Sequence, residues 1–269
     1  MGVPCDLHVH TRFSADSRAE MCDVCRQAIA CGLTEIAFTE HVDLMPADAG
    51  YGHFRPGAFM AEVNRCRTCF GDQLRILAGV EVGEPHRFPA EVKALLESYP
   101  FDLVIGSLHW VGEEPIFLPP AYYDRRPPAQ AFGDYFAELA VLCQAGGFDV
   151  LGHLDVIKRY CPDPAYEVWQ YEQAIRLALQ ALVEHGIALE INTSTLCRLL
   201  AQSSPDETVV RWYREMGGER LTFGSDAHAP ERLTAGWEHA VRLARQTGFS
   251  HWTSFRGRSP HDLPLENGL

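Results

Sequence analysis

The chain has 269 residues, with 23 Lys and Arg against 36 Asp and Glu, and a formal net charge of −13. This acidic balance disfavours nucleic-acid and membrane partners, which bind basic patches, but permits a small anionic substrate at a locally positive site. No run of about 18 apolar residues predicts a membrane span. The N-terminus shows no export signal, and nine cysteines without one indicate reduced thiols. We therefore expect a cytoplasmic protein; its oligomeric state stays unknown.

Short apolar segments alternate along the chain with amphipathic helical patterns. The expected strands are 4–9, 35–39, 74–82, 103–108, 149–151, 187–191 and 221–224. The expected helices are 18–31, 59–70, 129–145, 166–185, 206–216 and 235–247, each ending at or just before a glycine, which is a typical helix stop.

Continuous apolar strands separated by helices predict a parallel sheet that is covered on both faces. About seven such units in one chain predict an α/β fold, a distorted (β/α)7 TIM-like barrel that forms a single domain over residues 1–269. The Pro-rich segment 119–128 is expected to be a lid or a surface loop. The tail after Arg256 is expected to be irregular.

Two Cys-x-x-Cys pairs, Cys22/Cys25 and Cys66/Cys69, raise the question of a zinc or redox site. They lie about 40 residues apart, which is longer than the roughly 15–20 residues of a zinc ribbon. Both pairs also fall inside helical patterns, where residues three apart share a face. We therefore interpret these cysteines as small buried or half-buried residues.

Polar side chains follow each predicted strand at the point where it ends. In a parallel barrel these ends meet on one face, where barrel active sites lie. A buried carboxylate without a partner is costly, and coordination of a divalent cation removes that cost. The residues, strand by strand, are His8 and His10, Glu40 and His41, Glu81, His109, His153 and Asp155, Glu190 and Asn192, and Asp226 and His228.

The best candidate metal ligands are more numerous than one zinc ion, with its three or four protein ligands, can use. The set fits two or three ions with bridging carboxylates, and mixed His and carboxylate ligands suit Zn, Mn or Fe equally. The candidates are His8, His10, Asp16, His41, Glu81, His109, His153, Asp226 and His228.

The expected charge of such a site points to its substrate. Three divalent ions, three carboxylates and one hydroxide would leave a charge of about +2, which suits a phosphate dianion. Arg159 and Arg198 follow the fifth and sixth strand-end motifs, and arginine binds phosphate bidentately. These features favour a metal-dependent phosphoesterase.

At these residues the chain resembles the polymerase and histidinol phosphatase (PHP) superfamily, and within it the monofunctional histidinol-phosphatases of histidine biosynthesis. The resemblance covers nearly the whole chain. Its motifs are "DLHVHTRFSADS", "FTEH", "GVE", "GSLH", "GHLDVIKRY", "EINTS" and "GSDAH"; the segment "SLHWVGEEPIF" and the length point to the histidinol-phosphatase branch.

The resemblance implies hydrolysis of L-histidinol phosphate at a site with three metal ions, where a bridging hydroxide attacks phosphorus. Arg159 and Arg198 would help to hold the phosphate, and Asp226 or the nearby His228 would protonate the leaving alkoxide. The implied ligand sets are His8, His10, Glu81 and Asp226 for one ion, Glu81, His109 and His153 for a second, and Asp16, His41 and His228 for a third.

Selectivity for histidinol phosphate requires an acidic partner for the amino group and an apolar wall for the imidazole. Loops after the strand ends offer Glu113, Glu114, Phe117 and Asp43 for these roles. Whether Glu40, Asp155 and Glu190 orient the histidines stays open.

Two alternatives remain. The first is an exonuclease, or a nucleotide or other small-molecule phosphoesterase of the same superfamily, although few basic residues are available to track a polyanionic strand. The second is a barrel that has lost its chemistry and serves in assembly, although no expected ligand position is vacant.

Overall fold

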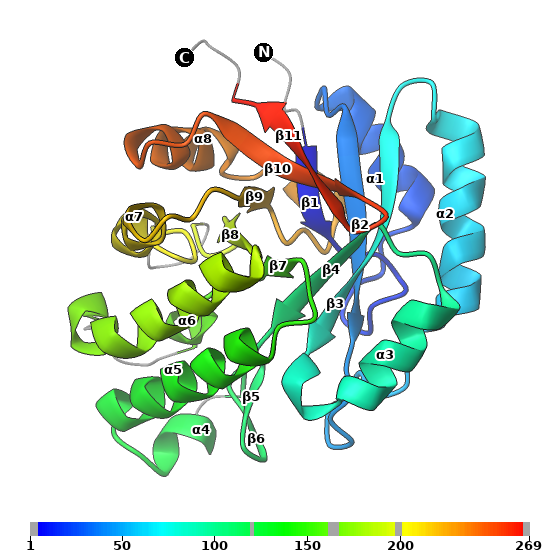
Figure 1. Cartoon of the computed structure of the whole chain (residues 1–269). Helices are drawn as coiled ribbons and strands as arrows, with labels where there is room; N and C mark the ends of the chain where they lie inside the picture. Colours follow the sequence, from blue (N-terminus) through cyan, green and yellow to red (C-terminus); the bar gives the residue numbers. More distant parts are fainter. Residues whose placement is uncertain (1–4, 119–120, 161–166, 197–200, 266–269) are drawn as a thin grey trace.

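A seven-stranded parallel sheet forms the centre of the fold, in the order β1-β2-β3-β4-β7-β8-β9 (Figure 1). The computed structural model describes residues 5–118, 121–160, 167–196 and 201–265. All seven strands are buried along their whole length or at all but one position, as the continuous apolar runs predict. The strands are β1 Cys5–Val9, β2 Glu35–Val42, β3 Arg75–Gly83, β4 Leu103–Ser107, β7 Val150–Leu151, β8 Ala188–Asn192 and β9 Leu221–Gly224.

The two edges of this sheet meet between β1 and the segment after β9. Val9 and Ala227 form a parallel bridge there. The His10 N–H donates to the Ala227 carbonyl at 2.9 Å, and the Asp226 N–H donates to the His8 carbonyl at 2.9 Å. The sheet is therefore a nearly closed barrel, which confirms the predicted fold class.

Helices cover the outer face of the sheet (Figure 1). In α1 the buried residues Met21, Val24, Cys25 and Ala28 repeat at the spacing of one helix face. Asp206 caps α7 by accepting hydrogen bonds from two backbone N–H groups of its first turn. The helices are α1 Met21–Ala30, α2 Pro56–Phe70, α3 Pro89–Ser98, α4 Ala121–Asp124, α5 Pro128–Ala145, α6 Glu172–His185, α7 Glu207–Glu215 and α8 Trp237–Gln246, with 3-10 turns at Pro85–Arg87, Val156–Arg159, Val168–Tyr171 and Pro230–Arg232.

All six expected helices are present, with ends shifted by a few residues, and α3 is an additional one. The segment 119–128 was expected to be a loop, but it contains the short helix α4; residues 119–120 lie outside the described residues. A small hairpin, β5 Trp110–Val111 with β6 Glu114–Pro115, was also not expected. Strands β5 and β6 have two residues each and α4 has four. Hydrophobic periodicity cannot identify such short elements from the sequence.

The expectation of an irregular tail after Arg256 is wrong. An antiparallel hairpin is present there, formed by strands β10 His251–Arg256 and β11 Ser259–Pro264. Its two-residue turn places Gly257 at φ 51° and Arg258 at φ 65°. Arg258 is not a typical residue for this turn, but its side chain pairs with Asp149 at 3.0 Å. A contact that is distant in sequence therefore stabilises a turn that local chemistry does not predict.

The hairpin lies at the N-terminal ends of the sheet strands, away from the strand ends that carry the predicted site. The Gly257 N–H donates to the carboxylate of Asp102, just before β4, at 3.1 Å. Asp149, which pairs with Arg258, lies just before β7. Among the described residues, no helix is both long and apolar enough to cross a membrane.

Candidate metal centre

The nine predicted metal ligands lie at the C-terminal ends of the sheet strands, on one face of the barrel. His8, His41 and Glu81 belong to β1, β2 and β3, and the parallel register pairs His41 directly with Glu81. The remaining six follow a strand within the next loop: His10, Asp16, His109, His153, Asp226 and His228. The barrel thus brings together residues separated by up to 220 positions in the sequence.

Glu81 is the centre of this group. Its carboxylate is fully buried and also accepts a hydrogen bond from Ser107 Oγ at 2.6 Å. Burial opposes ionisation, but the positive potential of His8 and His41 holds the pKa of Glu81 well below its ordinary value. Five imidazole nitrogens approach its two oxygens: those of His153 at 2.8 Å, His41 at 3.0 Å, His8 at 3.2 Å, and His10 and His109 at 3.5 Å.

Asp226 is a second carboxylate of the centre. Its Oδ1 lies 3.4 Å from His10 Nε2 and 3.5 Å from His228 Nδ1. Its Oδ2 accepts a hydrogen bond from Ser194 Oγ at 3.0 Å and lies 3.4 Å from Arg159 Nη2. Burial opposes ionisation here too, but the close approach of His10 and the nearby cations keep the pKa of Asp226 well below its ordinary value.

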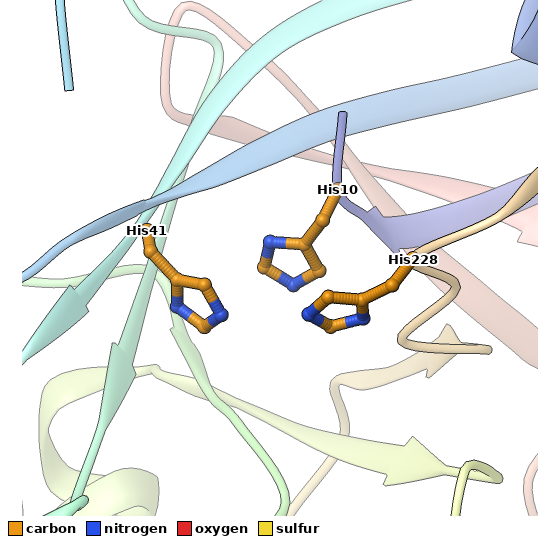
Figure 2. A group of neighbouring side chains, drawn as sticks. All are labelled: His10, His41 and His228. Atoms are coloured by element: carbon orange, nitrogen blue, oxygen red, sulfur yellow. The ribbon is translucent and has the colours of Figure 1, made fainter. Parts of the chain in front are cut away.

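Asp16 approaches the group from the more exposed side. Its Oδ2 lies 2.9 Å from His228 Nε2 and 3.6 Å from His41 Nε2. Figure 2 shows the rings of His10, His41 and His228 turned toward a common space, and the His10 ring centroid lies 4.2 Å from that of His41 and 4.3 Å from that of His228. Three imidazoles and one carboxylate, from strand β2 and the loops after β1 and β9, therefore surround one point.

Several polar atoms of the group are buried and have no hydrogen-bond partner. They are His8 Nε2, His10 Nε2, His41 Nδ1, Glu81 Oε2 and His153 Nδ1; the 3.0 Å approach of His41 to Glu81 lacks hydrogen-bond geometry. Each unpaired buried polar atom costs about 1–3 kcal/mol. Imidazole nitrogens and carboxylate oxygens are the donors that divalent metals take. The donor set therefore fits metal ions.

Three overlapping groups of these donors have ligand atoms within 4.8 Å of one another. They are His8, Glu81 and His153; His8, His10 and Asp226; and His10, His41 and His228. Because the groups share members, neighbouring ions would share ligands, as in the two-metal sites of hydrolases.

In the metal-free protein, some imidazoles of the group are neutral and others hold a proton. Burial, together with neighbouring His41 and His228, lowers the pKa of His10 to about 3, so this imidazole is neutral. Burial also disfavours charge on His8, but Glu190 and Glu81 raise the pKa of His8 well above its ordinary value. Metal binding must displace such protons.

Further carboxylates orient some of the imidazoles. Glu190 Oε1 lies 2.6 Å from His8 Nδ1. Glu40 accepts a hydrogen bond from Ser14 Oγ at 2.7 Å. Ser14 Oγ in turn lies 3.1 Å from His10 Nδ1. Of the three carboxylates left open by the sequence, Glu190 and Glu40 thus support histidines. Asp155 instead accepts hydrogen bonds from Lys158 at 2.8 Å and from Ser204 at 2.6 Å.

A cavity of about 430 Å³ opens onto the centre. Among the predicted substrate contacts, Arg159, Asp43 and Phe117 line it. Glu113 and Glu114 do not: Glu113 is 81 % exposed and pairs with Arg87 at 3.0 Å, and Glu114 pairs with Arg126 at 2.7 Å. Arg198 lies outside the described residues.

Sequence reasoning missed Glu84, which shapes the cavity wall. This buried carboxylate accepts hydrogen bonds from the backbone N–H groups of His109 and Trp110. Burial raises the pKa of Glu84 to about 7. The sequence did carry a signal for Glu84, because this residue follows the end of β3, three residues after Glu81 and just before Pro85. Asp48, which accepts from Trp110 Nε1 at 2.9 Å and also lines the cavity, carried no such signal.

A model of the PHP domain matches residues 6–194, which hold all the predicted ligands except Asp226 and His228. The chain belongs to the PHP domain family. Within this PHP family it falls in the histidinol-phosphatase branch, which confirms the resemblance seen in the sequence.

Two curated relatives are similar over most of their length. The histidinol-phosphatase of Lactococcus lactis is 31% identical over 255 residues, 94% of each chain. The probable histidinol-phosphatase of Clostridium acetobutylicum is 29% identical over 248 residues, 89% of this chain and 92% of the relative.

A crystal structure of the L. lactis histidinol phosphate phosphatase, complexed with zinc, L-histidinol and phosphate, has the same fold. Its TM-score is 0.90 at 28% identity, and the match covers 96% of this PHP chain and 98% of that one. A putative histidinol phosphatase from Listeria monocytogenes also shares the fold, with a TM-score of 0.75 at 18% identity over 87% of this chain and 99% of that one.

Proposed function

We propose that this protein is a metal-dependent phosphomonoesterase that hydrolyses L-histidinol phosphate to L-histidinol and phosphate in histidine biosynthesis. The single observation that carries this proposal is the near-complete match to the L. lactis enzyme, whose crystal structure holds zinc, L-histidinol and phosphate. The convergence of nine His and carboxylate side chains at one cavity supports the same reaction.

We propose three metal ions, of Zn, Mn or Fe, at this centre. Bound divalent ions supply Lewis-acid polarisation of a phosphoryl group and a nucleophile that works at neutral pH. Support comes from the distances: Glu81 reaches ligands of the first two sets, and Asp16 lies 2.9 Å from His228 in the third. The sets are His8, His10, Glu81 and Asp226; Glu81, His109 and His153; and Asp16, His41 and His228.

Arg159 is the proposed phosphate ligand of the chain itself. It lines the cavity, and its Nη2 lies 3.4 Å from Asp226, which ties the guanidinium to the metal centre. Its Nε has no hydrogen-bond partner and is free to complete a bidentate contact with phosphate. Arg198 keeps the same proposed role from the sequence alone.

The leaving alkoxide needs a proton, for which Asp226 and His228 are the candidates. The pKa of Asp226 is held well below its ordinary value by His10 and nearby cations, so this carboxylate is ionised. Although burial opposes it, the hydrogen bond with Asp16 raises the pKa of His228. In the metal-free protein His228 therefore holds a proton more readily than Asp226 does.

Asp43 and Phe117 are the proposed contacts for the histidinol part of the substrate. Asp43 has a carboxylate oxygen within 4.8 Å of ring nitrogens of His41 and His109, beside the metal centre. A carboxylate there is placed to pair with the substrate amino group. Phe117 packs edge-on against Trp110 and offers an apolar wall for the imidazole ring. Glu113 and Glu114 do not line the cavity and are not proposed for this purpose.

The deciding experiment is steady-state phosphate release from L-histidinol phosphate, with and without a chelator. We expect a kcat/KM of about 10⁴ M⁻¹s⁻¹ or more, lost on chelation and restored by metal. Release of mononucleotides from an oligonucleotide would instead support the exonuclease alternative. Stoichiometric metal without hydrolysis of any phosphoester would support a non-catalytic barrel.

A second assay addresses specificity. Asp43→Asn is expected to raise KM for L-histidinol phosphate about tenfold, since a charge-assisted contact contributes about 1.5–3 kcal/mol, and to leave the hydrolysis of p-nitrophenyl phosphate unchanged. Equal losses for both substrates would assign Asp43 to the metal centre rather than to the amino group.

A cytoplasmic location remains part of the proposal, in keeping with the free thiols of all described cysteines.

A further inference from the structure

A cluster of thiols lies between α1 and α2, outside the barrel and apart from the cavity. Cys22 and Cys25 are three residues apart on α1, and Glu62 and Cys66 are four residues apart on α2. Each pair therefore shares one face of its helix. The two helices are in contact, so these faces meet. The sequence suggested no joint role for these residues, because their Cys-x-x-Cys spacing is wrong for a zinc ribbon.

The side chains of the cluster converge closely. Cys22 Sγ lies 3.5 Å from Cys66 Sγ, and one ligand atom each from Cys22, Glu62 and Cys66 lies within 4.8 Å of the other two. Cys25 lies one helical turn after Cys22 and outside this group of three. Cys25 and Cys66 are fully buried, whereas Cys22 is partly exposed and leaves a way in from solvent.

These distances suit metal coordination. At a zinc–sulfur distance of about 2.3 Å, two sulfurs 3.5 Å apart subtend an angle of about 100° at the metal, close to tetrahedral. A disulfide would require the same sulfurs to approach to about 2.05 Å. We propose that Cys22, Cys66 and Glu62 form a second metal site, for a thiophilic divalent ion of the zinc type, that links α1 to α2.

The charges of the site are consistent with this role. Burial raises the pKa of Cys66, so this thiol is neutral in the metal-free protein and metal binding releases its proton. Arg65 pairs with Glu62, with Nε 2.9 Å from Oε2. Each carboxylate oxygen has a second lone pair for a metal, and the guanidinium offsets part of the negative charge of a thiolate-rich site.

The proposed site differs chemically from the metal centre of the barrel. The candidate ligands of that centre are nitrogens and oxygens, and no cysteine lines its cavity among the described residues. Among the described residues, thiolate-to-metal charge-transfer absorption therefore reports on the α1–α2 site and not on the metal centre of the barrel.

The test is a titration of the metal-loaded, reduced protein with Cd²⁺, followed by thiolate-to-cadmium charge-transfer absorption in the ultraviolet. The wild type is expected to show a band that saturates at one Cd²⁺ per chain. Cys22→Ser, at the partly exposed position, should weaken Cd²⁺ binding at least about tenfold. The matched control is Cys69→Ser, because Cys69 is an exposed thiol on the same helix outside the cluster; its titration should equal that of the wild type.

Several results would overturn the proposal. They are absence of the band from the wild type, an equal band in Cys22→Ser, or loss of the band in Cys69→Ser. Phosphate release by each variant shows that it is folded, since none of these cysteines touches the cavity. A thiol count on an air-exposed sample covers the competing chemistry: loss of two thiols with no cadmium band would assign Cys22 and Cys66 to a disulfide instead.

Discussion

At the scale of single residues, substitution of Glu81 is expected to have the largest effect on activity, because five imidazoles approach its carboxylate. Glu81→Gln keeps the shape but removes the charge that two of the proposed ions share. We expect kcat/KM for L-histidinol phosphate to fall at least about 100-fold and bound metal to fall with it, both measured on the same preparation.

The matched control is Glu113→Gln, which makes the same chemical change at an exposed site outside the cavity. It should leave both quantities unchanged. Full activity in Glu81→Gln would show that the proposed metal mechanism is wrong.

Arg159 tests the phosphate contact separately from the metals. Arg159→Ala removes a charged donor worth about 1.5–3 kcal/mol, so we expect kcat/KM to fall roughly 10–100-fold. Metal content should stay near the wild-type value, because no nitrogen of Arg159 is a proposed ligand. Arg125→Ala is the control, since Arg125 is 72 % exposed. A loss of metal equal to the loss of activity would assign Arg159 to support of Asp226 instead.

At the scale of secondary structure, Asp6 joins β1 to the segments after β9. Its carboxylate accepts backbone hydrogen bonds from Ser225 at 3.0 Å and Thr234 at 3.1 Å. Burial raises the pKa of Asp6 from 3.8 to about 6. The folded state thus holds this proton more tightly than the unfolded state. The resulting stabilisation, roughly 3 kcal/mol, is complete below about pH 4 and is lost as the pH rises to about 6.

Asp6→Asn removes this titration. We expect the free energy of unfolding of the metal-free wild type, relative to the variant, to decrease by roughly 3 kcal/mol between pH 4 and pH 6.5. Urea denaturation of both proteins across this range measures the difference. A difference that is constant with pH would show that Asp6 has an ordinary pKa in the folded protein.

The hairpin β10–β11 is a second test at this scale. Trp252 of β10 is fully buried, and its ring lies 5.4 Å from that of Trp237 and 6.3 Å from that of Phe223. Trp252→Ala should destabilise the protein by about 3–5 kcal/mol, as measured by urea denaturation. Because the hairpin lies away from the metal centre, the kcat of the folded fraction should be unchanged. A large fall in kcat at full folding would contradict this separation.

Much of the fold and site could be predicted from sequence because the signals are local. Buried strands read as apolar runs, and parallel strands must end on one face, so the convergence of residues such as His8, Glu81 and Asp226 followed from topology alone. Glycines mark the helix ends: Gly186 after α6 adopts φ 64°, a conformation that favours glycine.

The missed features depend on contacts between distant segments. The turn at Gly257 and Arg258 is held by Asp102 and Asp149, which precede two sheet strands. The direction of a loop is not encoded in its composition, so Glu113 could not be distinguished from Asp43 as a cavity residue. The single domain over residues 1–269 and the individual ligand roles stay predictions.

At the scale of the whole molecule, metal binding and folding are coupled. Removing the metals leaves several buried imidazole and carboxylate atoms without partners. A ligand at about 1,000 times its dissociation constant adds roughly 4 kcal/mol, which for a protein of this size corresponds to a Tm shift of roughly 10 °C. We expect a chelator to lower Tm by about this amount in calorimetry and zinc to restore it. An unchanged Tm would place the metals outside the folded core.

The meeting of β1 with the segment after β9 has a consequence for how the protein is made. His8 and His10 leave the ribosome first, whereas Asp226 and His228 are synthesised only after more than 200 further residues. For most of its synthesis the nascent chain therefore carries His8 and His10 but lacks Asp226 and His228. These two residues complete two of the proposed ligand sets. Pairings this distant in sequence also form slowly. The full complement of ions belongs to the finished chain, and a ribosome stalled before residue 220 would display an incomplete binding site.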